Sequence, residues 1–241
     1  MNVRLTSFKR AAIIQPGKIG DIVICLPMAK YLVDRGFQVI WPIDQSYLQM
    51  FESVVDYVTF LPIPAKDCNQ ARELAKQCQC ALILNIGFGQ VGNEYISDEW
   101  MRNQKLSFDK YKYELANIPF EEKFKLQINR NHEREESLFK KLVTSKRYVV
   151  IHEQSSDHKR DINVITDPEV QKIYIQNQSD SIFDWIKIFE NAEKLYFVDS
   201  CMVNLCSGLG IKTPGIRHKR TGYNRPNDID YPILTSNWAT V

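Results

Sequence analysis

Short apolar runs recur along the first third of the chain, and segments with helical spacing separate them. The runs predict strands at 11–15, 37–42, 57–61 and 81–86, and the segments between them predict helices at 21–35, 47–54 and 66–79. The runs are continuously apolar rather than alternating, which is typical of a parallel sheet with helices on both faces. The pattern therefore predicts repeated β-α-β units.

This alternation stops after residue 90 and starts again near residue 131. The later pattern predicts strands at 148–152, 172–176, 194–198 and near 213–216, with helices at 133–144, 181–192 and 200–209. We therefore predict an α/β protein of two Rossmann-like parallel-sheet domains, residues 1–130 and 131–241, that face a central cleft. The segment 90–130, rich in aromatic and charged residues, is predicted to be an insertion over one sheet edge.

Composition excludes some classes of protein. The 241 residues are 44% hydrophobic, which is enough for a sizeable core, and the net charge of +2 gives no reason to expect nucleic-acid binding. No apolar run approaches the roughly 20 residues of a membrane span, and no signal peptide is evident. The six cysteines are then expected to be reduced thiols in a cytoplasmic protein. Cys78 and Cys80 have no second Cys/His pair near them, so no metal site is expected.

The first chemical signal is the turn Gly17-Lys18-Ile19-Gly20-Asp21, between the first predicted strand and helix. Two glycines allow a sharp turn and a close approach to a ligand, and the helix N-terminus behind them favours an anion. Asp21 at this position either caps the helix or acts as a base on a substrate. The turn is neither a P-loop nor a dinucleotide fingerprint, since the lysine and the third glycine that those motifs need are missing.

The second signal is the run from Asp199 to Gly210, in which a buried strand leads through Asp199-Ser200 into a helix of small residues. Ser200 is a good N-cap, and the first-turn N–H groups of residues 201–203 can hold a phosphate. A capped core helix without a ligand is the alternative interpretation, with about equal weight.

Together these two motifs resemble those of glycosyltransferase family 9, the heptosyltransferases and their relatives with the GT-B fold. The turn at 17–23, followed by Leu26-Pro27, is similar to the family's N-terminal motif. The residues 199–205 and 208–214 are similar to its donor loop. The chain departs from the pattern at Pro16, Cys201 and Asn204, which stand where the family has Arg, Gly and His, and the chain is about a hundred residues shorter than typical members.

The resemblance implies roles for individual residues. Asp21 matches the proposed general base, while Gly17, Lys18 and Gly20 form the phosphate and acceptor loop. The residues implied for the donor site are Asp199, Ser200, Cys201, Met202 and Asn204, with Asp180 and Ser181 near the donor ribose. Ser181 is equally well interpreted as a helix cap.

Several other polar or aromatic residues are further candidates. The loop residues His158, Lys159 and Arg160 follow a predicted strand and are expected to meet the donor phosphates, with a solvated loop as the alternative. The basic run 217–220 can bind phosphate or be a solvated loop, and His152 is expected to be a satisfied strand-end histidine. Trp100, Tyr111 and Tyr113 form either an acceptor platform or the insertion's own small core.

The function that these features favour is metal-independent, inverting glycosyl transfer. The predicted donor is a nucleotide-diphosphate sugar, and the acceptor is a hydroxyl of a glycan or lipid-linked glycan. The absence of an Asp-x-Asp pair in a suitable loop favours a reaction without a metal or cofactor. Two alternatives stay open: a catalytically silent nucleotide-sugar or glycan-binding protein on the same scaffold, and a different α/β enzyme such as an epimerase or phosphotransferase.

Overall fold

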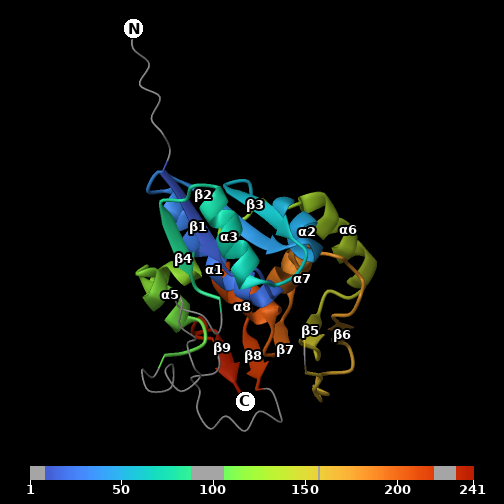
Figure 1. The fold of residues 1–241 in the computed structure, drawn as a ribbon. Helices are drawn as coiled ribbons and strands as arrows, with labels where there is room; N and C mark the ends of the chain where they lie inside the picture. Colours follow the sequence, from blue (N-terminus) through green and yellow to red (C-terminus); the bar gives the residue numbers. More distant parts are fainter. Residues whose placement is uncertain (1–8, 88–105, 157, 220–231) are drawn as a thin grey trace.

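The computed structural model describes residues 9–87, 106–156, 158–219 and 232–241, and it contains two separate parallel sheets. The first has the strand order β3-β2-β1-β4 and the second the order β6-β5-β7-β8-β9. Every strand pair in both sheets is parallel, and the two sheets lie one above the other in Figure 1. The predicted α/β class with two parallel-sheet units is confirmed.

The first unit is built from residues 9–87. Its strands are β1 (Lys9–Ile14), β2 (Phe37–Asp44), β3 (Val58–Ile63) and β4 (Leu82–Asn85). Its helices are α1 (Ile19–Val33), the single turn η1 (Gln45–Tyr47), α2 (Leu48–Glu52) and α3 (Cys68–Gln77). The last four residues of β1 are completely buried, as expected for a central strand covered on both faces.

The second unit begins after the helix α6 (His132–Leu142). Its strands are β5 (Tyr148–His152), β6 (Gln171–Tyr174), β7 (Lys194–Val198), β8 (Gly215–His218) and β9 (Trp238–Thr240). Its helical segments are η3 (Ile182–Trp185), α7 (Ile186–Asn191) and α8 (Cys201–Gly208). The sequence pattern missed β9, a three-residue edge strand that is mostly exposed and therefore carries no apolar signal.

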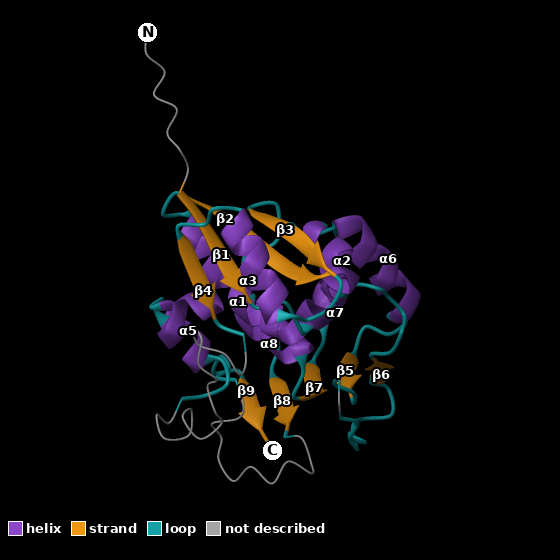
Figure 2. Ribbon diagram, in the orientation of Figure 1, coloured by secondary structure: helices purple, strands orange, loops and turns teal. Residues whose placement is uncertain are grey.

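Helices α1 and α8 pack against each other between the two sheets, as Figure 2 shows. Helix α1 is apolar nearly all round, and nine of its residues are buried. A helix of that kind needs apolar partners on more than one side. One continuous cluster of buried side chains includes residues of both sheets and both helices, so the two units share a core.

Residues 106–128 form a bridge between the units that the sequence pattern did not resolve. It contains α5 (Lys110–Ala116) and the short turn η2 (Phe120–Phe124). On one side the Tyr113 hydroxyl donates to the carbonyl of Ile24 in α1 at 2.9 Å. On the other side the backbone N–H of Leu126 donates to the carbonyl of Gly208 in α8 at 3.0 Å. The bridge is thus fixed to both helices of the interface.

A buried ion pair ties this bridge to the C-terminal residues. Lys123 Nζ lies 2.5 Å from Asp109 Oδ2, and both side chains are almost completely buried. The same ammonium donates to the carbonyl of Ile233, whose own N–H donates to Asp109 Oδ2 at 2.9 Å. Burial lowers the pKa of Lys123, and the Asp109 carboxylate partly restores it. Through Ile233, the pair therefore links the bridge to residues more than a hundred positions later in the sequence.

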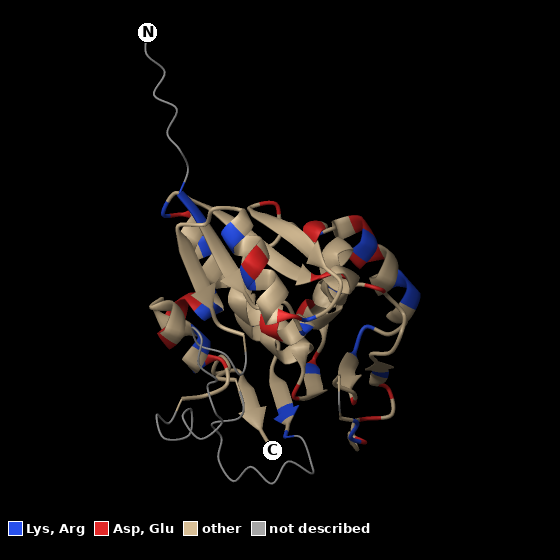
Figure 3. Ribbon diagram, viewed as in Figure 1, with Lys and Arg blue, Asp and Glu red and all other residues tan. Residues whose placement is uncertain are grey.

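Charged residues of both signs are distributed over the elements of both units. Figure 3 shows acidic and basic residues on both α6 and α3. This agrees with the near-neutral net charge. Among the described residues, no helix is long and apolar enough to cross a membrane. The domain boundary at 130/131 stays a prediction, and Trp100 lies outside the described residues.

We expect Lys123→Met to lower the free energy of unfolding by about 3–5 kcal/mol, because it leaves the Asp109 carboxylate buried without its ammonium. The double variant Lys123→Met/Asp109→Asn should recover part of that loss, since asparagine carries no charge and its one amide oxygen can still accept from the N–H of either Lys110 or Ile233. Urea denaturation measures both. Equal losses in the single and double variants would contradict the pairing.

Candidate functional site

The glycine turn at the end of β1 is held by a buried glutamine. Gln15 is 2% exposed, and one orientation of its amide satisfies both polar atoms: Nε2 donates to the carbonyl of Gly17 at 2.8 Å and Oε1 accepts from Lys112 Nζ at 2.9 Å. Gly17 has little free space, because an added Cβ would lie 3.1 Å from Tyr47 and from Lys66. The turn is therefore closely packed, which explains the glycine.

Asp21 lies in the first turn of α1 and has two roles in the hydrogen-bond network. Its Oδ2 accepts from the backbone N–H of Lys18 at 3.3 Å, which is the capping interaction expected of an acidic residue at this place. Its Oδ1 lies 3.0 Å from Lys112 Nζ. The Asp21 side chain keeps 16% of its surface exposed, whereas that of Lys112 is completely buried. The carboxylate is thus held from the inside and remains accessible from the outside.

Lys112 reaches Asp21 from α5, in the bridge. Its ammonium also donates to the Tyr111 hydroxyl at 2.8 Å and lies 4.8 Å from the ring centres of Phe108 and Tyr111. Burial disfavours the charged form, but Tyr111 and Asp21 favour it more, and the pKa of Lys112 stands above its ordinary value. Burial also raises the pKa of the neighbouring Cys25 thiol to about 12, so Cys25 is neutral at physiological pH.

The N-terminus of α8 in the second unit is the other half of the site. Ser200 is its N-cap residue, but the Ser200 side chain does not cap the helix. Instead, Ser200 Oγ lies 3.0 Å from Nδ1 of His152, the last residue of β5. Burial lowers the pKa of His152 to about 4, so this histidine is neutral at physiological pH. The first-turn N–H groups of α8 are therefore not occupied by the Ser200 hydroxyl.

The two motifs predicted from sequence meet directly. An added Cβ at Gly20 would lie 3.6 Å from Cα and Cβ of Cys201, so the N-terminus of α1 touches the N-terminus of α8. Lys18 Nζ crosses to the second unit and donates to Ser156 Oγ at 3.1 Å. Two helix N-termini and one lysine thus converge beside the Asp21 carboxylate, an arrangement that favours an anion at this place.

A cavity of about 280 Å³ opens beside this junction, at the carboxyl ends of β5 and β6. Open parallel sheets bind ligands at this edge. The lining combines polar side chains with four large apolar ones: His152, Gln154, Ser155, Ile175, Gln176, Asn177, Ser179, Asp180, Ser181, Ile182, Trp185 and Met202. The structure thus brings Asp180, Ser181 and Met202 to one cavity. Ser181 also accepts from the N–H of Phe183 at 3.3 Å as the cap of η3, its alternative interpretation.

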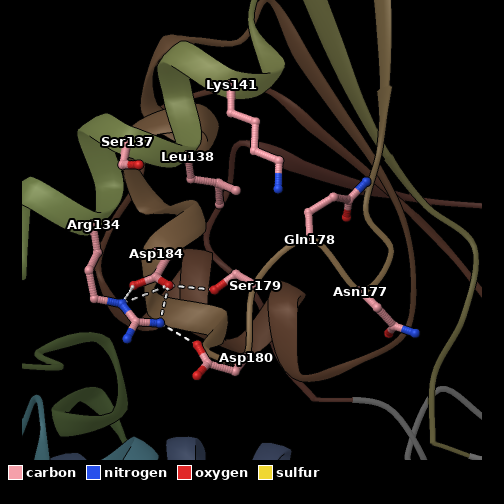
Figure 4. Close-up of a pocket in the computed structure, with 9 residues that line it drawn as sticks. All are labelled: Arg134, Ser137, Leu138, Lys141, Asn177, Gln178, Ser179, Asp180 and Asp184. Atoms are coloured by element: carbon pink, nitrogen blue, oxygen red, sulfur yellow. Dashed lines mark hydrogen bonds and ion pairs between the residues drawn. The ribbon is translucent and has the colours of Figure 1, made fainter.

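A wider groove of about 640 Å³ continues from this cavity toward α6 (Figure 4). Figure 4 shows Arg134 of α6 reaching across to Asp180 and Asp184; its Nη2 lies 2.8 Å from Asp184 Oδ2. The hydrogen bond that Arg134 donates to Asp180 lowers the pKa of the Asp180 carboxyl. Asp180, expected near a ribose, is therefore already paired with an arginine. Both cavities are lined by residues of 134–202 alone, so neither is the predicted cleft between the units.

Other predicted donor residues lie away from the cavity lining. Asp199 is 5% exposed, and its Oδ1 lies 3.9 Å from Arg217 Nη1 inside the protein. Asn204 is also buried; its Nδ2 donates to the Ser200 carbonyl at 3.2 Å, and within the described part of the chain no hydrogen-bond partner reaches its Oδ1. Both residues support the loop around Ser200 rather than line the cavity.

The basic residues divide into two groups. Lys159 is exposed on the loop after β5, and Arg160 Nη1 donates to the carbonyl of Lys219 at 2.7 Å, which holds that loop close to the end of β8. Arg217 is 7% exposed and donates to the carbonyl of Pro232 at 2.6 Å, so it is a structural residue and not the phosphate ligand that the basic run suggested.

The aromatic platform is not present at the tyrosines. Tyr111 is 1% exposed and Tyr113 is completely buried. Tyr111 belongs to a small cluster within the bridge, and Tyr113 belongs to the core that the two units share. The six cysteines are all free in the structure. No cluster of three or more His, Cys, Asp or Glu side chains that suits a metal ion occurs in the residues that the structure describes.

Sequence reasoning missed Lys112, the cation beside Asp21. A signal was present: Phe108, Tyr111, Lys112 and Leu115 follow the spacing of one helical face, so Lys112 stands where an apolar residue is expected. A lysine at such a position is buried and needs an anionic or polar partner. The sequence cannot say which carboxylate that is, because Asp21 lies 91 positions earlier.

Comparison with known proteins identifies the fold. No protein-family model and no curated protein matches the sequence. A glycosyl transferase family 9 protein from Veillonella parvula aligns over 100% of this chain and 88% of its own, with a TM-score of 0.64 and 11% identity. The ADP-heptose LPS heptosyltransferase II of E. coli aligns over 97% and 90%, with a TM-score of 0.61 and 8% identity.

The E. coli heptosyltransferase WaaC, solved with ADP, aligns over 96% of this chain and 92% of its own, with a TM-score of 0.51 and 12% identity. At such low identity these likenesses show the fold. The predicted GT-B-like arrangement of two Rossmann-like units is thereby confirmed.

We expect His152 to make the stability of the protein depend on pH. The folded-state pKa of about 4 lies below the ordinary value of 6.5, so the unfolded chain binds the extra proton between these pH values. The contribution of His152 to the free energy of unfolding should be fully present above pH 6.5. As the pH falls to 4, the free energy of unfolding should decrease by roughly 3 kcal/mol from this group alone. Urea denaturation of wild type and His152→Gln at pH 7, 5.5 and 4.5 measures it. Identical pH slopes for the two proteins would contradict a neutral, buried His152.

Proposed function

We propose that this chain is a metal-independent, inverting glycosyltransferase. It moves a sugar from a nucleotide-diphosphate sugar to a hydroxyl of a glycan or lipid-linked glycan. The observation that carries the proposal is the meeting of the Asp21 turn with the N-terminus of α8, where Gly20 packs on Cys201 beside a 280 Å³ cavity. The GT-B-like fold and the resemblance of the two motifs to glycosyltransferase family 9 support it.

The donor nucleoside occupies the cavity at the ends of β5 and β6 in this proposal. Trp185, Ile182 and Met202 supply apolar surface for a base, and Gln176, Asn177 and Ser179 supply amide and hydroxyl groups for hydrogen bonds. A volume of about 280 Å³ is at the lower limit for a ligand of this size. The continuous groove along α6 provides further room.

The diphosphate then lies at the N-terminus of α8. The N–H groups of Cys201, Met202 and Val203 point out of the first turn, and the helix dipole stabilises the negative charge that grows as the diphosphate leaves. Lys18 crosses to Ser156 at this place and Lys159 is exposed nearby in sequence, so both are candidate cations for the leaving group. Transfer without a metal needs such groups in place of the metal ion.

Asp21 acts as the general base on the acceptor. The acceptor oxygen attacks the anomeric carbon, the bond from that carbon to the diphosphate oxygen breaks, and Asp21 takes the hydroxyl proton. A single displacement of this kind inverts the anomeric configuration. The accessible side of the Asp21 carboxylate, beside the diphosphate site, is where the acceptor hydroxyl must lie.

A catalytically silent nucleotide-sugar or glycan-binding protein is the second candidate. Asn204 stands where the similar family has a histidine, and it is buried with its amide bonded to Ser200, so it does not line the cavity. Loss of that contact weakens the stabilisation of a leaving group more than it weakens binding. Transfer activity therefore separates the two candidates.

We predict that a nucleoside diphosphate binds in the presence of a metal chelator, as measured by calorimetry. The sequence does contain one Asp-x-Asp pair, Asp228 and Asp230, outside the described residues, so the chelator is an informative part of the test. Binding that disappears with chelator contradicts the metal-free proposal.

Replacing Lys159 or Arg160 with alanine should weaken nucleoside-diphosphate binding by about 1.5–3 kcal/mol, or roughly 10- to 150-fold, the range for charge-assisted hydrogen bonds. The control is Lys146→Ala, which removes a lysine just before the amino end of β5, whereas the loop with Lys159 and Arg160 follows the carboxyl end of that strand. If both loop variants bind like the control, the loop does not hold the phosphates.

Asp21→Asn removes the base and keeps the size of the side chain, so we expect transfer to fall by roughly 10²–10⁴-fold. The structure adds a complication, because the substitution leaves the Lys112 ammonium buried without its anion and should also lower stability by about 1–3 kcal/mol. The double variant Asp21→Asn/Lys112→Met removes this unpaired charge and should recover stability.

The double variant should nevertheless remain inactive while it binds the nucleoside diphosphate. Rates of sugar transfer and affinity for the diphosphate are measured on the same preparations. Near-normal transfer by a folded Asp21→Asn protein would show that Asp21 is only a helix cap.

A further inference from the structure

The described structure contains a completely buried lysine that the proposed reaction does not use. Lys112 lies in α5, in the bridge between the units, and its side chain has no exposed surface. Burial of an ammonium is costly unless the charge is paired and hydrogen-bonded. Three groups meet this need: Asp21 Oδ1 at 3.0 Å, Gln15 Oε1 at 2.9 Å and the Tyr111 hydroxyl at 2.8 Å.

These contacts close a ring through the glycine turn. Gln15 donates to the carbonyl of Gly17 and accepts from Lys112. Lys112 also pairs with Asp21, and Asp21 accepts from the backbone N–H of Lys18, the residue after Gly17. The ring includes the turn that touches the N-terminus of α8. A lysine from the bridge thus determines the positions of residues on both sides of the turn.

We propose that Lys112 is the positioning residue of the Asp21 carboxylate, which it holds by one oxygen from inside the protein so that the accessible side faces the acceptor. The proposal rests on the proposed function for the role of Asp21. In this proposal the bridge 106–128 contributes to the reacting centre by positioning Asp21, although the bridge lines neither of the two cavities.

An ion pair that only stabilised the fold would not require this asymmetry. In the Lys123–Asp109 pair of the same bridge both side chains are buried, so the Asp109 carboxylate has no accessible oxygen. In the Lys112–Asp21 pair the cation is buried and the anion is 16% exposed. The two pairs therefore provide a matched comparison within one segment.

The role has a consequence for pH dependence. Burial lowers the pKa of Lys112, but Tyr111 and Asp21 together raise it above its ordinary value, so the ammonium of the pair stays charged. The other titratable groups that face this pair are Tyr111 of α5, Cys25 of α1 and Cys68 of α3, and the backbone N–H of Lys18 donates to Asp21. Burial raises the pKa of Tyr111, Cys25 and Cys68, so these three are neutral at physiological pH.

The test follows the Lys112 ammonium by NMR, in protein labelled at its lysines. The signal is assigned by its loss in Lys112→Met. In Asp21→Asn the lysine should lose its proton at lower pH than in wild type, because its anion is gone. The signal of Lys123, an equally buried lysine of the same bridge, should titrate alike in both proteins.

The rate of sugar transfer provides a second readout. Lys112→Met should lower kcat by roughly 10- to 100-fold while the affinity for the nucleoside diphosphate stays almost unchanged, because a carboxylate that is no longer held is misplaced for the acceptor. Lys123→Met should not lower kcat. An unchanged kcat in folded Lys112→Met overturns the proposal. So does an equal fall of kcat in both variants, because that is the result of a structural role alone.

If Lys112→Met does not fold, the lysine titration in wild type and Asp21→Asn decides alone. An unchanged lysine titration overturns the proposal. If wild type transfers no sugar while the lysine titration shifts as expected, the proposed function fails and the Lys112–Asp21 coupling is supported.

Discussion

The structure depends on the pairing of two buried lysines in one bridging segment. Lys112 and Lys123 are both buried, where water cannot solvate an ammonium, so each must meet an anion. Lys112 meets Asp21 of the first unit, and Lys123 meets Asp109 together with the backbone of Ile233 near the C-terminus. These requirements fix the bridge against both units, and through the bridge they fix α1 against α8.

This docking decides where chemistry is possible. Because Gly20 packs on Cys201, the Asp21 turn and the helix that would hold the diphosphate meet without a wide opening between them. In the proposed function the nucleoside binds to one side, in the cavity at the ends of β5 and β6, rather than between the sheets. The acceptor of that proposal approaches Asp21 from the exposed side of its carboxylate.

The sequence predicted elements whose signal is local. The strands at 148–152 and 194–198 were predicted with their observed ends, because each is a continuous apolar run between polar residues. It did not predict the bridge, where the helix α5 is only seven residues long and carries a lysine on its apolar face. The Asp21 turn and the Ser200 loop were found from their residue types. Their contact, and the cation that Asp21 meets, depend on packing between distant segments that no local pattern encodes.

A crystal structure of the protein with a nucleoside diphosphate, grown in the presence of chelator, tests the central claim most directly. The account predicts the phosphate oxygens within hydrogen-bond distance of the N–H groups of Cys201 and Met202, with the base against Trp185 and the Asp21 carboxylate still held by Lys112. A diphosphate bound elsewhere on the molecule, or no bound nucleotide at concentrations that saturate the protein in solution, would contradict it.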